Sequence, residues 1–338
     1  MDRRTFIAAG TLAAGAMGFA GCGRNQGARA GAPIPVTDPP TDAAANAAAP
    51  DRPAKAGKHR VLDAPPGEVH AAIAKKGAPA ERVKAAVDAF GGIQTIVNPG
   101  DRVVIKPNLA WARTPDVGAN TTPAILAAVI KLAMDAGAKE VAVVEHSCDK
   151  STITFEMTGA QQVCDELGVQ LIGLDNQAMY VEHDVGGSNI GRDLLAREIL
   201  ESDVYINLPC LKHHGATIVS LSMKNQMGAN WDRQSYHSKG AVAGGSDNLH
   251  RNIADLAGVL RPTLVVIDAT FALKSNGPKG PGDLEETGAV IVSHDMVAAD
   301  ALGTEMLGFK LENVPHLAMA QELGVGRMDL ENLAVARV

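Results

Sequence analysis

Short apolar runs alternate with segments of helical periodicity through most of the chain after residue 80. The runs 103–105, 141–144 and 204–208 are rich in β-branched residues and have the length of buried strands. Segments 81–90 and 123–136 repeat apolar residues at helical spacing, and each is followed by a glycine, which commonly closes a helix. The second segment also begins with Thr122 as a candidate N-cap and Pro123 in the first helical turn.

The same pattern continues toward the end of the chain. We expect further strands at 169–174, 263–267 and 289–292, and further helices at 159–167 and 248–260. Asp193 is expected to cap a helix that reaches about residue 201, and 175–192 is expected to form an extra hairpin. Because strands that alternate with helices build parallel sheets, the sequence predicts an α/β fold with a mostly parallel sheet, helices on both faces and a single domain over residues 58–338.

Polar side chains follow five of the expected strands at the point where each strand ends. In order along the chain these are Lys106 and Asn108, Glu145 and His146, Cys210 with Lys212, His213 and His214, then Asp268, and finally Ser293, His294 and Asp295. A strand can end in polar residues merely because it meets solvent. The recurrence favours a site, because the carboxyl ends of parallel strands lie at one edge of a sheet.

Two residues of this set are lysines, and a third lysine, Lys224, follows the histidines. Lys106, Lys212 and Lys224 are predicted to neutralise a carboxylate or phosphate of a ligand, since an ammonium acts as a point charge for anions. The structural alternative for a lysine at the end of a buried strand is an ion pair with Glu145 or Asp268. The residues predicted to bind the ligand beside the catalytic candidates Lys106, Lys212 and His214 are Asn108, Lys224, Asn225 and Asp268.

The adjacent histidines cannot both face one centre if they continue a strand, because neighbouring side chains point to opposite faces. We assign His214 to the site and expect His213 to pack elsewhere or face solvent. His214 could act as an acid or base near neutral pH, or it could ligate a divalent metal with His146, His237, His250 or a carboxylate, of which His146 and His237 are the preferred partners. No His-x-x-x-His spacing supports the metal alternative.

Composition and charge exclude several classes of function. The 338-residue chain has a formal net charge of −7, which argues against a nucleic-acid partner. It contains no Walker-type phosphate loop, and no Gly-x-Gly-x-x-Gly follows an expected strand. The cysteines form no Cys-x-x-Cys pair, so we expect no self-contained iron–sulfur cluster.

The N-terminal residues predict export. Arg3 and Arg4 precede an uncharged run rich in alanine and glycine, as in a twin-arginine signal. The run ends in Phe-Ala-Gly-Cys, so the prediction is either lipidation at Cys22 or ordinary cleavage nearby. Residues 1–22 form the expected signal, and residues 23–57, rich in alanine and proline, form an expected disordered tether. The protein is then expected in the periplasm or on the outer face of the cell membrane, held to the membrane only by the signal or a lipid.

Several short motifs together resemble a family known as domain of unknown function 362. Over residues 103–303 they are Lys106-Pro107-Asn108, Thr121-Thr122-Pro123, Leu208-Pro209 with Lys212 and His214, Met223-Lys224-Asn225 with Gly228, Ile267-Asp268-Ala269, Gly277-Pro278, and Ser293, Asp295 and Asp300 with Leu302-Gly303. Relatives of this kind sometimes carry ferredoxin-like cysteine runs or occur beside iron–sulfur proteins. The resemblance therefore implies an iron–sulfur or redox protein as a partner, although this chain lacks those cysteines.

Two hypotheses about function follow. The first is an exported, enzyme-like protein that acts on a small anionic ligand at the lysine and histidine site, with or without a metal or redox cofactor. The second is a non-catalytic accessory or binding protein for an envelope redox or metal system. The first requires at least two of the lysines and one histidine to line a single concave site.

Overall fold

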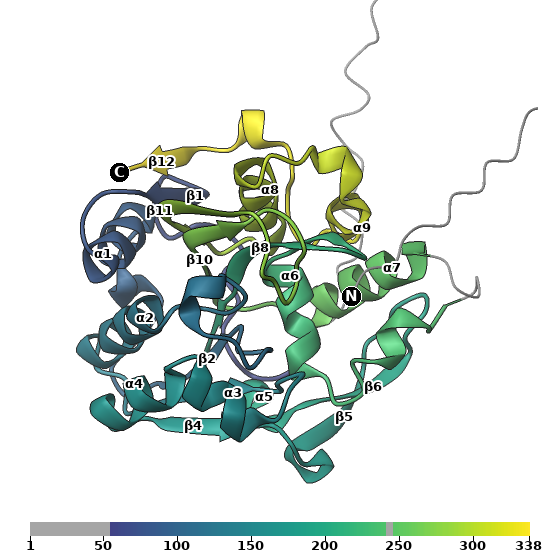
Figure 1. Ribbon diagram of the computed structural model, residues 1–338, viewed down its shortest axis with the longest axis horizontal. Helices are drawn as coiled ribbons and strands as arrows, with labels where there is room; N and C mark the ends of the chain where they lie inside the picture. Colours follow the sequence, from purple (N-terminus) through teal and green to yellow (C-terminus); the bar gives the residue numbers. More distant parts are fainter. Residues whose placement is uncertain (1–54, 241–245) are drawn as a thin grey trace, which may run out of the picture. The chain divides into compact units, whose positions relative to one another are not determined.

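A twisted, mostly parallel sheet forms the centre of the structure (Figure 1). The computed structural model describes residues 55–240 and 246–338, all within the second of two units, Ala49–Val338. The main path of the sheet, in the order in which its strands lie side by side, is β12 (Val335–Arg337), β1 (Ala71–Ala74), β11 (Leu284–Ser293), β10 (Leu264–Leu273), β7 (Val204–Leu208), β2 (Arg102–Pro107), β3 (Glu140–Glu145) and β4 (Gln170–Gly173).

All strands of this path run in one direction except β11, which is antiparallel to both of its neighbours. The predicted mostly parallel sheet is therefore confirmed. This exception shows that one prediction was wrong, namely that Ser293, His294 and Asp295 lie at the same edge of the sheet as the other polar strand ends. Ser293 lies beside Val265 and Ala71, near the amino ends of β10 and β1. The polar residues after β11 thus lie at the opposite edge of the sheet from those after β2, β3 and β7.

The order of the strands reverses between β2 and β7. From β2 the chain moves outward through β3 to β4, and it then returns to place β7 and β10 on the other side of β2. In open parallel sheets the crevice at such a reversal, beyond the carboxyl ends of the strands, is where ligands bind.

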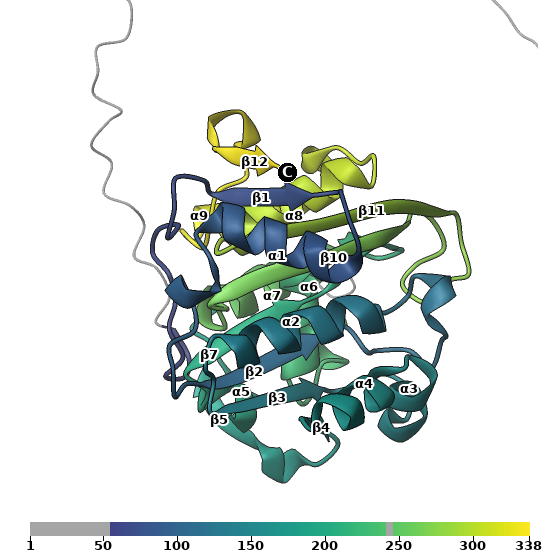
Figure 2. The same ribbon diagram turned by 90° about the vertical axis from the view of Figure 1, so that its left-hand side faces the viewer.

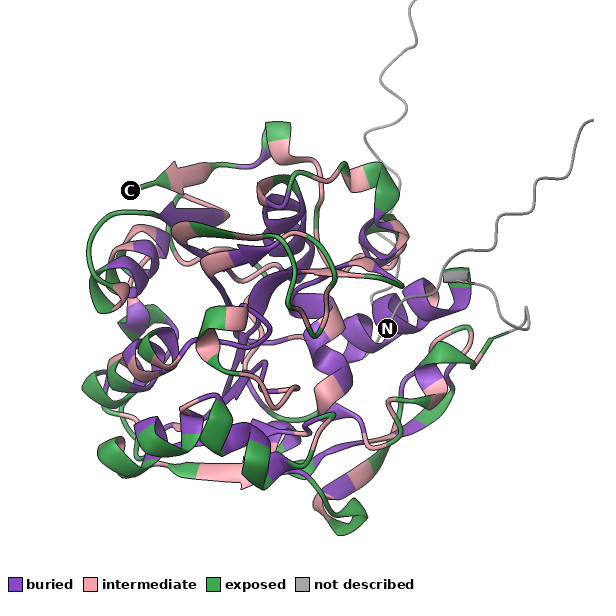
Figure 3. Ribbon diagram, in the orientation of Figure 1, coloured by how far each residue is buried: buried purple, intermediate pink, exposed green. Residues whose placement is uncertain are grey.

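Helices cover both faces of the sheet, as predicted (Figures 2 and 3). One face carries α1 (Pro79–Phe90), α2 (Pro123–Asp135) and α4 (Ala160–Leu167), and the other carries α7 (Ser246–Val259), α8 (Met296–Met306) and α9 (Pro315–Glu322). Along β2, Val103 and Ile105 pack toward the first group, whereas Val104 packs toward the second. The strand is apolar on both sides for this reason, since each face of a parallel sheet is buried.

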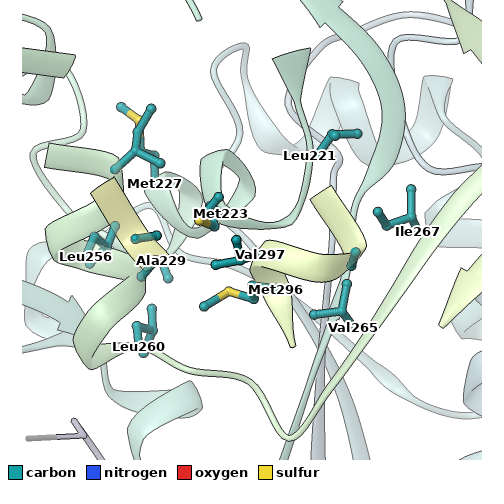
Figure 4. Close-up of a cluster of buried hydrophobic side chains, with 14 of the residues drawn as sticks. Leu221, Met223, Met227, Ala229, Leu256, Leu260, Val265, Ile267, Met296 and Val297 are labelled. Atoms are coloured by element: carbon teal, nitrogen blue, oxygen red, sulfur yellow. The ribbon is translucent and has the colours of Figure 1, made fainter. Parts of the chain in front are cut away.

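The second of these hydrophobic layers combines aliphatic and methionine side chains with the buried tyrosines Tyr180, Tyr205 and Tyr236, and Figure 4 shows part of its aliphatic and methionine cluster. Leu256 and Leu260 meet Met296 and Val297 across it, and Met223 lies beside them. Met223 belongs to α6 (Ser222–Asn225), the short helix that follows the histidines. The core therefore fixes the position of α6, which carries two of the predicted ligand-binding residues.

The strand before Pro209 ends where expected, but the chain then forms a further strand. β8 (Cys210–His214) pairs in parallel with the C-terminal half of β10 and in antiparallel fashion with β9 (Ile218–Ser220). The reactive residues of the Pro209–His214 stretch consequently alternate between the two sides of a strand.

The predicted helix capped by Asp193 is wrong. Residues 192–196 form β6 (Arg192–Ala196), which pairs along its whole length with β5 (Tyr180–Asp184), and the helix α5 is only Arg197–Leu200. Residues 192–196 form a strand because pairing with β5 and burial of Leu195 outweigh the preference of Asp193 for a helix N-cap, which is worth only about 1 kcal/mol. The extra hairpin expected at 175–192 thus extends to residue 196.

The expected export signal, Cys22 and nearly all of the expected tether lie outside the described residues. Within the part of the chain that the structure describes, no helix is long and apolar enough to cross a membrane.

Candidate functional site

A cavity of about 350 Å³ lies where β2 and β3 end and α6 begins. It brings together most of the residues singled out from the sequence. From that set it is lined by Lys106, Asn108, Glu145, His146, Lys212, His214, Lys224, Asn225 and His237, and further lining residues include Trp111, Cys148, Gly228, Arg233 and Lys279.

Lys106 is completely buried at the end of β2 and has a counter-ion. Its Nζ lies 2.9 Å from Oε1 of Glu145, the last residue of β3, and donates to Oδ1 of Asn225 at 3.2 Å. Burial lowers the pKa of Lys106 below its ordinary value, and Glu145 opposes this effect. The ion pair with Glu145 was the structural alternative for this lysine, and its charge is compensated within the protein.

Lys212 lies on β8 and is also buried, but it has no carboxylate partner among the described residues. Its Nζ donates to Oδ1 of Asn108 at 2.8 Å and to the carbonyl of Ala119. These neutral acceptors orient the ammonium without cancelling its charge.

Two asparagines connect the buried lysines. Oδ1 of Asn225 accepts hydrogen bonds from Lys106 and, at 2.9 Å, from Nδ2 of Asn108, whose own Oδ1 accepts from Lys212. Nδ2 of Asn225 donates to Oδ1 of Asn207 on β7 at 2.8 Å. The amides predicted to bind ligand therefore hold the lysines in place, which makes the arrangement rigid before any ligand arrives.

Lys224 differs from the other two lysines. It is part-buried, lines the cavity, and makes no hydrogen bond or ion pair with any described residue. Burial, reinforced by the positive charges of Lys212 and Arg233, lowers its pKa from 10.5 to about 8. An ammonium without an internal partner is an open position for an anion.

The loop after α6 supplies another cation. Arg233, which no sequence motif indicated, donates from its guanidinium to the carbonyls of His146 and Ser147 and lines the cavity. At the mouth, Lys279 of the β10–β11 turn lies 4.5 Å from the ring centre of Trp111. The cavity wall thus contains five cationic side chains and one carboxylate, that of Glu145.

His214 faces this positive field. Its Nδ1 accepts a hydrogen bond from the backbone N–H of Ala216 at 3.1 Å, which places the ring proton on Nε2. Burial and the nearby Lys224 and Lys212 lower its pKa to about 2. The imidazole is therefore neutral and can donate from Nε2. His213, on the other side of β8, packs near Phe309 instead.

The three histidines proposed as metal ligands all line the cavity. His146 stacks on Trp231 with ring centres 5.5 Å apart, and its Nδ1 lies 3.1 Å from the carbonyl of Asn230, whereas His237 is largely exposed. Across residues 55–240 and 246–338, no three His, Cys, Asp or Glu side chains form a group that could hold a metal ion.

Asp268 lies outside the cavity. Its Oδ2 accepts from both the backbone N–H and the hydroxyl of Thr122, each at 2.7 Å, and its Oδ1 accepts from the N–H of Thr270. The carboxylate therefore holds the start of α2, and Thr122 acts as a donor to Asp268 and not as the expected side-chain cap.

Three residues that line the cavity, Arg233, Trp111 and Cys148, were not predicted from the sequence because little in it marks them. Arg233 and Trp111 lie in loops without periodicity, and Cys148 follows the end of β3 by three residues. The one sequence feature that could have pointed to Arg233 is the length of the polar stretch at 229–247, because long loops often contribute to sites.

The site residues fall within a recognised family. The family model described as "Domain of unknown function (DUF362)" matches residues 103–305. The chain belongs to this family. The resemblance expected from the short motifs is confirmed.

One relative is the thylakoid-associated protein sll1697 of Synechocystis, which is 26% identical over 239 residues, covering 71% of this chain and 73% of the relative. Two solved structures resemble the fold. The lactate racemase apoprotein from Thermoanaerobacterium thermosaccharolyticum has a TM-score of 0.45 at 15% identity, covering 75% of this chain and 61% of that chain. A Thermotoga maritima protein has a TM-score of 0.38 at 11% identity, covering 69% and 60%. The chain spans about three fifths of each structure.

Proposed function

We propose that this member of the family binds a small ligand with a carboxylate or phosphate group in the cavity and acts on it as an enzyme. The observation that carries the proposal is the surplus of positive charge, in particular the unpartnered ammonium of Lys224 beside Lys212 and Arg233. Holding such cations close together out of water is costly unless an anion offsets them. The cavity volume, about 350 Å³, lies in the range of small-molecule sites.

The roles within this proposal follow from the contacts. Lys212 and Arg233 are held by neutral acceptors, so their charges remain available to the ligand. His214 supplies an N–H that can donate to a ligand oxygen. Lys106 is neutralised by Glu145 and organises the wall of the cavity through Asn225.

Calorimetric titration of the full chain with inorganic phosphate and with oxalate tests the proposal. We expect Lys224→Gln to weaken binding of the preferred anion by at least about tenfold, because a charge-assisted contact is worth roughly 1.5–3 kcal/mol. Lys131→Gln, an exposed lysine of α2, is the matched control and should bind as the unmodified chain does. Binding that is absent, or equal in the two variants, contradicts the proposal.

The pKa of Lys224 gives this test a pH dependence. The amine is charged below about pH 8 and loses its proton as the pH rises above that value. Anion affinity should therefore be highest below pH 8 and fall above it, and the Lys224→Gln variant should lose this step. An affinity that increases above pH 8 would contradict the assignment of Lys224.

We also propose that the protein reaches the periplasm or the outer face of the cell membrane through the twin-arginine route. The support is Arg3-Arg4 before an uncharged run that ends at Cys22.

A further inference from the structure

The three lysines of the cavity differ in what their amines can do. Lys106 Nζ contacts Glu145 and donates to Asn225 and the Pro107 carbonyl, and Lys212 Nζ donates to Asn108 and the Ala119 carbonyl. Lys224 alone among them has no partner in the described part of the chain. Its amine is the one whose lone pair can be exposed to a ligand without breaking a hydrogen bond.

We propose that Lys224 is a covalent catalytic residue, whose amine forms a Schiff base with the carbonyl carbon of a small anionic aldehyde or 2-oxo acid. This inference rests on the proposed binding of anions in the same cavity. It adds the reactive group of the ligand, a carbonyl adjacent to or near the anionic group.

The step is balanced without any further reactant. The ammonium first releases a proton to solvent, and the neutral amine then attacks the carbonyl carbon to form a C–N bond. The resulting carbinolamine loses its oxygen as water, so one amine and one carbonyl give one imine and one water. No electrons are gained or lost, and no metal or redox cofactor takes part.

The surroundings of Lys224 favour this reaction. Burial and the neighbouring Lys212 and Arg233 lower its pKa to about 8, so a substantial fraction of the amine is neutral near physiological pH. A lysine beside other cations is a recognised way of activating an amine as a nucleophile. The same two cations are placed to hold the anionic group of the substrate.

His214 completes the arrangement. Its Nδ1 is engaged by the N–H of Ala216, so the neutral ring presents only an N–H donor at Nε2 to the cavity that it shares with Lys224. A neutral imidazole donor can polarise the carbonyl oxygen during attack and hydrogen-bond the carbinolamine hydroxyl. The ring is held uncharged by the same positive field that lowers the pKa of Lys224.

Reductive trapping of the full chain tests the proposal. The protein is incubated with glyoxylate or pyruvate, sodium borohydride is added, and the products are examined by intact mass and peptide mapping. We expect one secondary amine, located at Lys224, in the presence of either carbonyl compound. Oxalate, an anion without a reactive carbonyl, should slow the labelling by competing for the cavity.

Two variants make the outcome specific. Lys224→Arg retains the positive charge but cannot form a Schiff base, so it should bind oxalate and give no adduct. Lys131→Gln should be labelled as the unmodified chain is.

Two results overturn the inference and differ in what they imply. If oxalate binds in a Lys224-dependent manner but neither carbonyl compound labels Lys224, the Schiff base is wrong and the proposed anion site stands. If labelling is spread equally over exposed lysines and oxalate does not bind, the Schiff base and the proposed function both fail.

Discussion

At the scale of single residues, the site is a set of buried charges that are only partly compensated. Lys106 has Glu145 at 2.9 Å, whereas Lys212 and Lys224 have no carboxylate partner among the described residues. Natural proteins retain such groups where activity needs them, because the same groups reduce stability.

Replacing Lys224 by methionine should therefore stabilise the protein while abolishing anion binding. Folding lowers the pKa of Lys224 from 10.5 to about 8, so the unfolded chain binds the proton of this amine more tightly than the folded chain does. Lys224 therefore lowers the free energy of unfolding, and this effect is complete below about pH 8, where the amine is protonated in both states. We expect a gain of about 2 kcal/mol in the free energy of unfolding at pH 7, which shrinks as the pH rises above 8. Urea unfolding at several pH values measures it, with Lys131→Met as the control.

A methionine variant that is less stable than the unmodified chain at pH 7 would show that Lys224 has a stabilising partner in solution. That outcome would also remove the argument for an open anion position.

Gly228 is a second residue whose identity the site requires. A Cβ at this position would meet the Glu145 carboxylate and lie 2.7 Å from Nζ of Lys106. Gly228→Ala should separate the ion pair and cost about 1–3 kcal/mol, the usual range for overpacking. Gly191→Ala is the matched control, because a Cβ there meets nothing within 4 Å. Equal urea midpoints for the two variants would contradict the role of Gly228.

At the scale of elements, one contact between helices positions α6 and thereby Lys224. Asp300 of α8 accepts hydrogen bonds from the backbone N–H groups of Ser222 and Met223, at 2.7 and 2.9 Å, and from the Ser222 hydroxyl. Its carboxylate caps α6 from another helix, since α6 has no side-chain cap of its own.

Asp300→Ala should weaken anion binding and destabilise the fold by about 2–4 kcal/mol, because it leaves buried N–H groups without an acceptor. Asp295→Ala is the matched comparison: Asp295 caps its own helix α8 at the other edge of the sheet, accepting from the N–H groups of Val297 and Ala298, and it also accepts from that of Arg327. It should cost about 1–2 kcal/mol and leave anion binding unchanged. Calorimetry and urea unfolding of both variants decide whether the cap of α6 has a specific effect on the site.

At the scale of the whole chain, the proposed export route can be tested independently of the cavity. Replacing Arg3 and Arg4 by lysine should retain the full-length protein in the cytoplasm, because the paired arginines are what the twin-arginine route recognises. Cell fractionation and immunoblotting measure the distribution. Cys22→Ala should leave export intact and release the protein from the membrane fraction if Cys22 is lipidated. Unchanged export of the Arg3 and Arg4 variant would contradict the proposed route.

The sequence by itself determined the layered fold and the family. Buried parallel strands must be apolar on both faces, so β2, β3 and β7 appear as continuous apolar runs, and helices that pack on them show a periodic apolar face. The polar residues that end β2 and β3, and those that follow β7, were visible for the same reason, because a change from apolar to polar marks the end of a buried strand.

Only the tertiary structure decided the direction of β11, the pairing of β6 with β5 and the partners of the three lysines. The residues of β11 do not show whether the strand runs parallel or antiparallel to its neighbours. Because it is antiparallel, Ser293, His294 and Asp295 lie at the opposite edge of the sheet from the cavity. The strand β6 formed at the expense of the expected helix because β5 was available to pair with it. Lys106, Lys212 and Lys224 are the same residue type in similar apolar surroundings, and long-range contacts alone gave Lys106 a carboxylate, Lys212 neutral acceptors and Lys224 none.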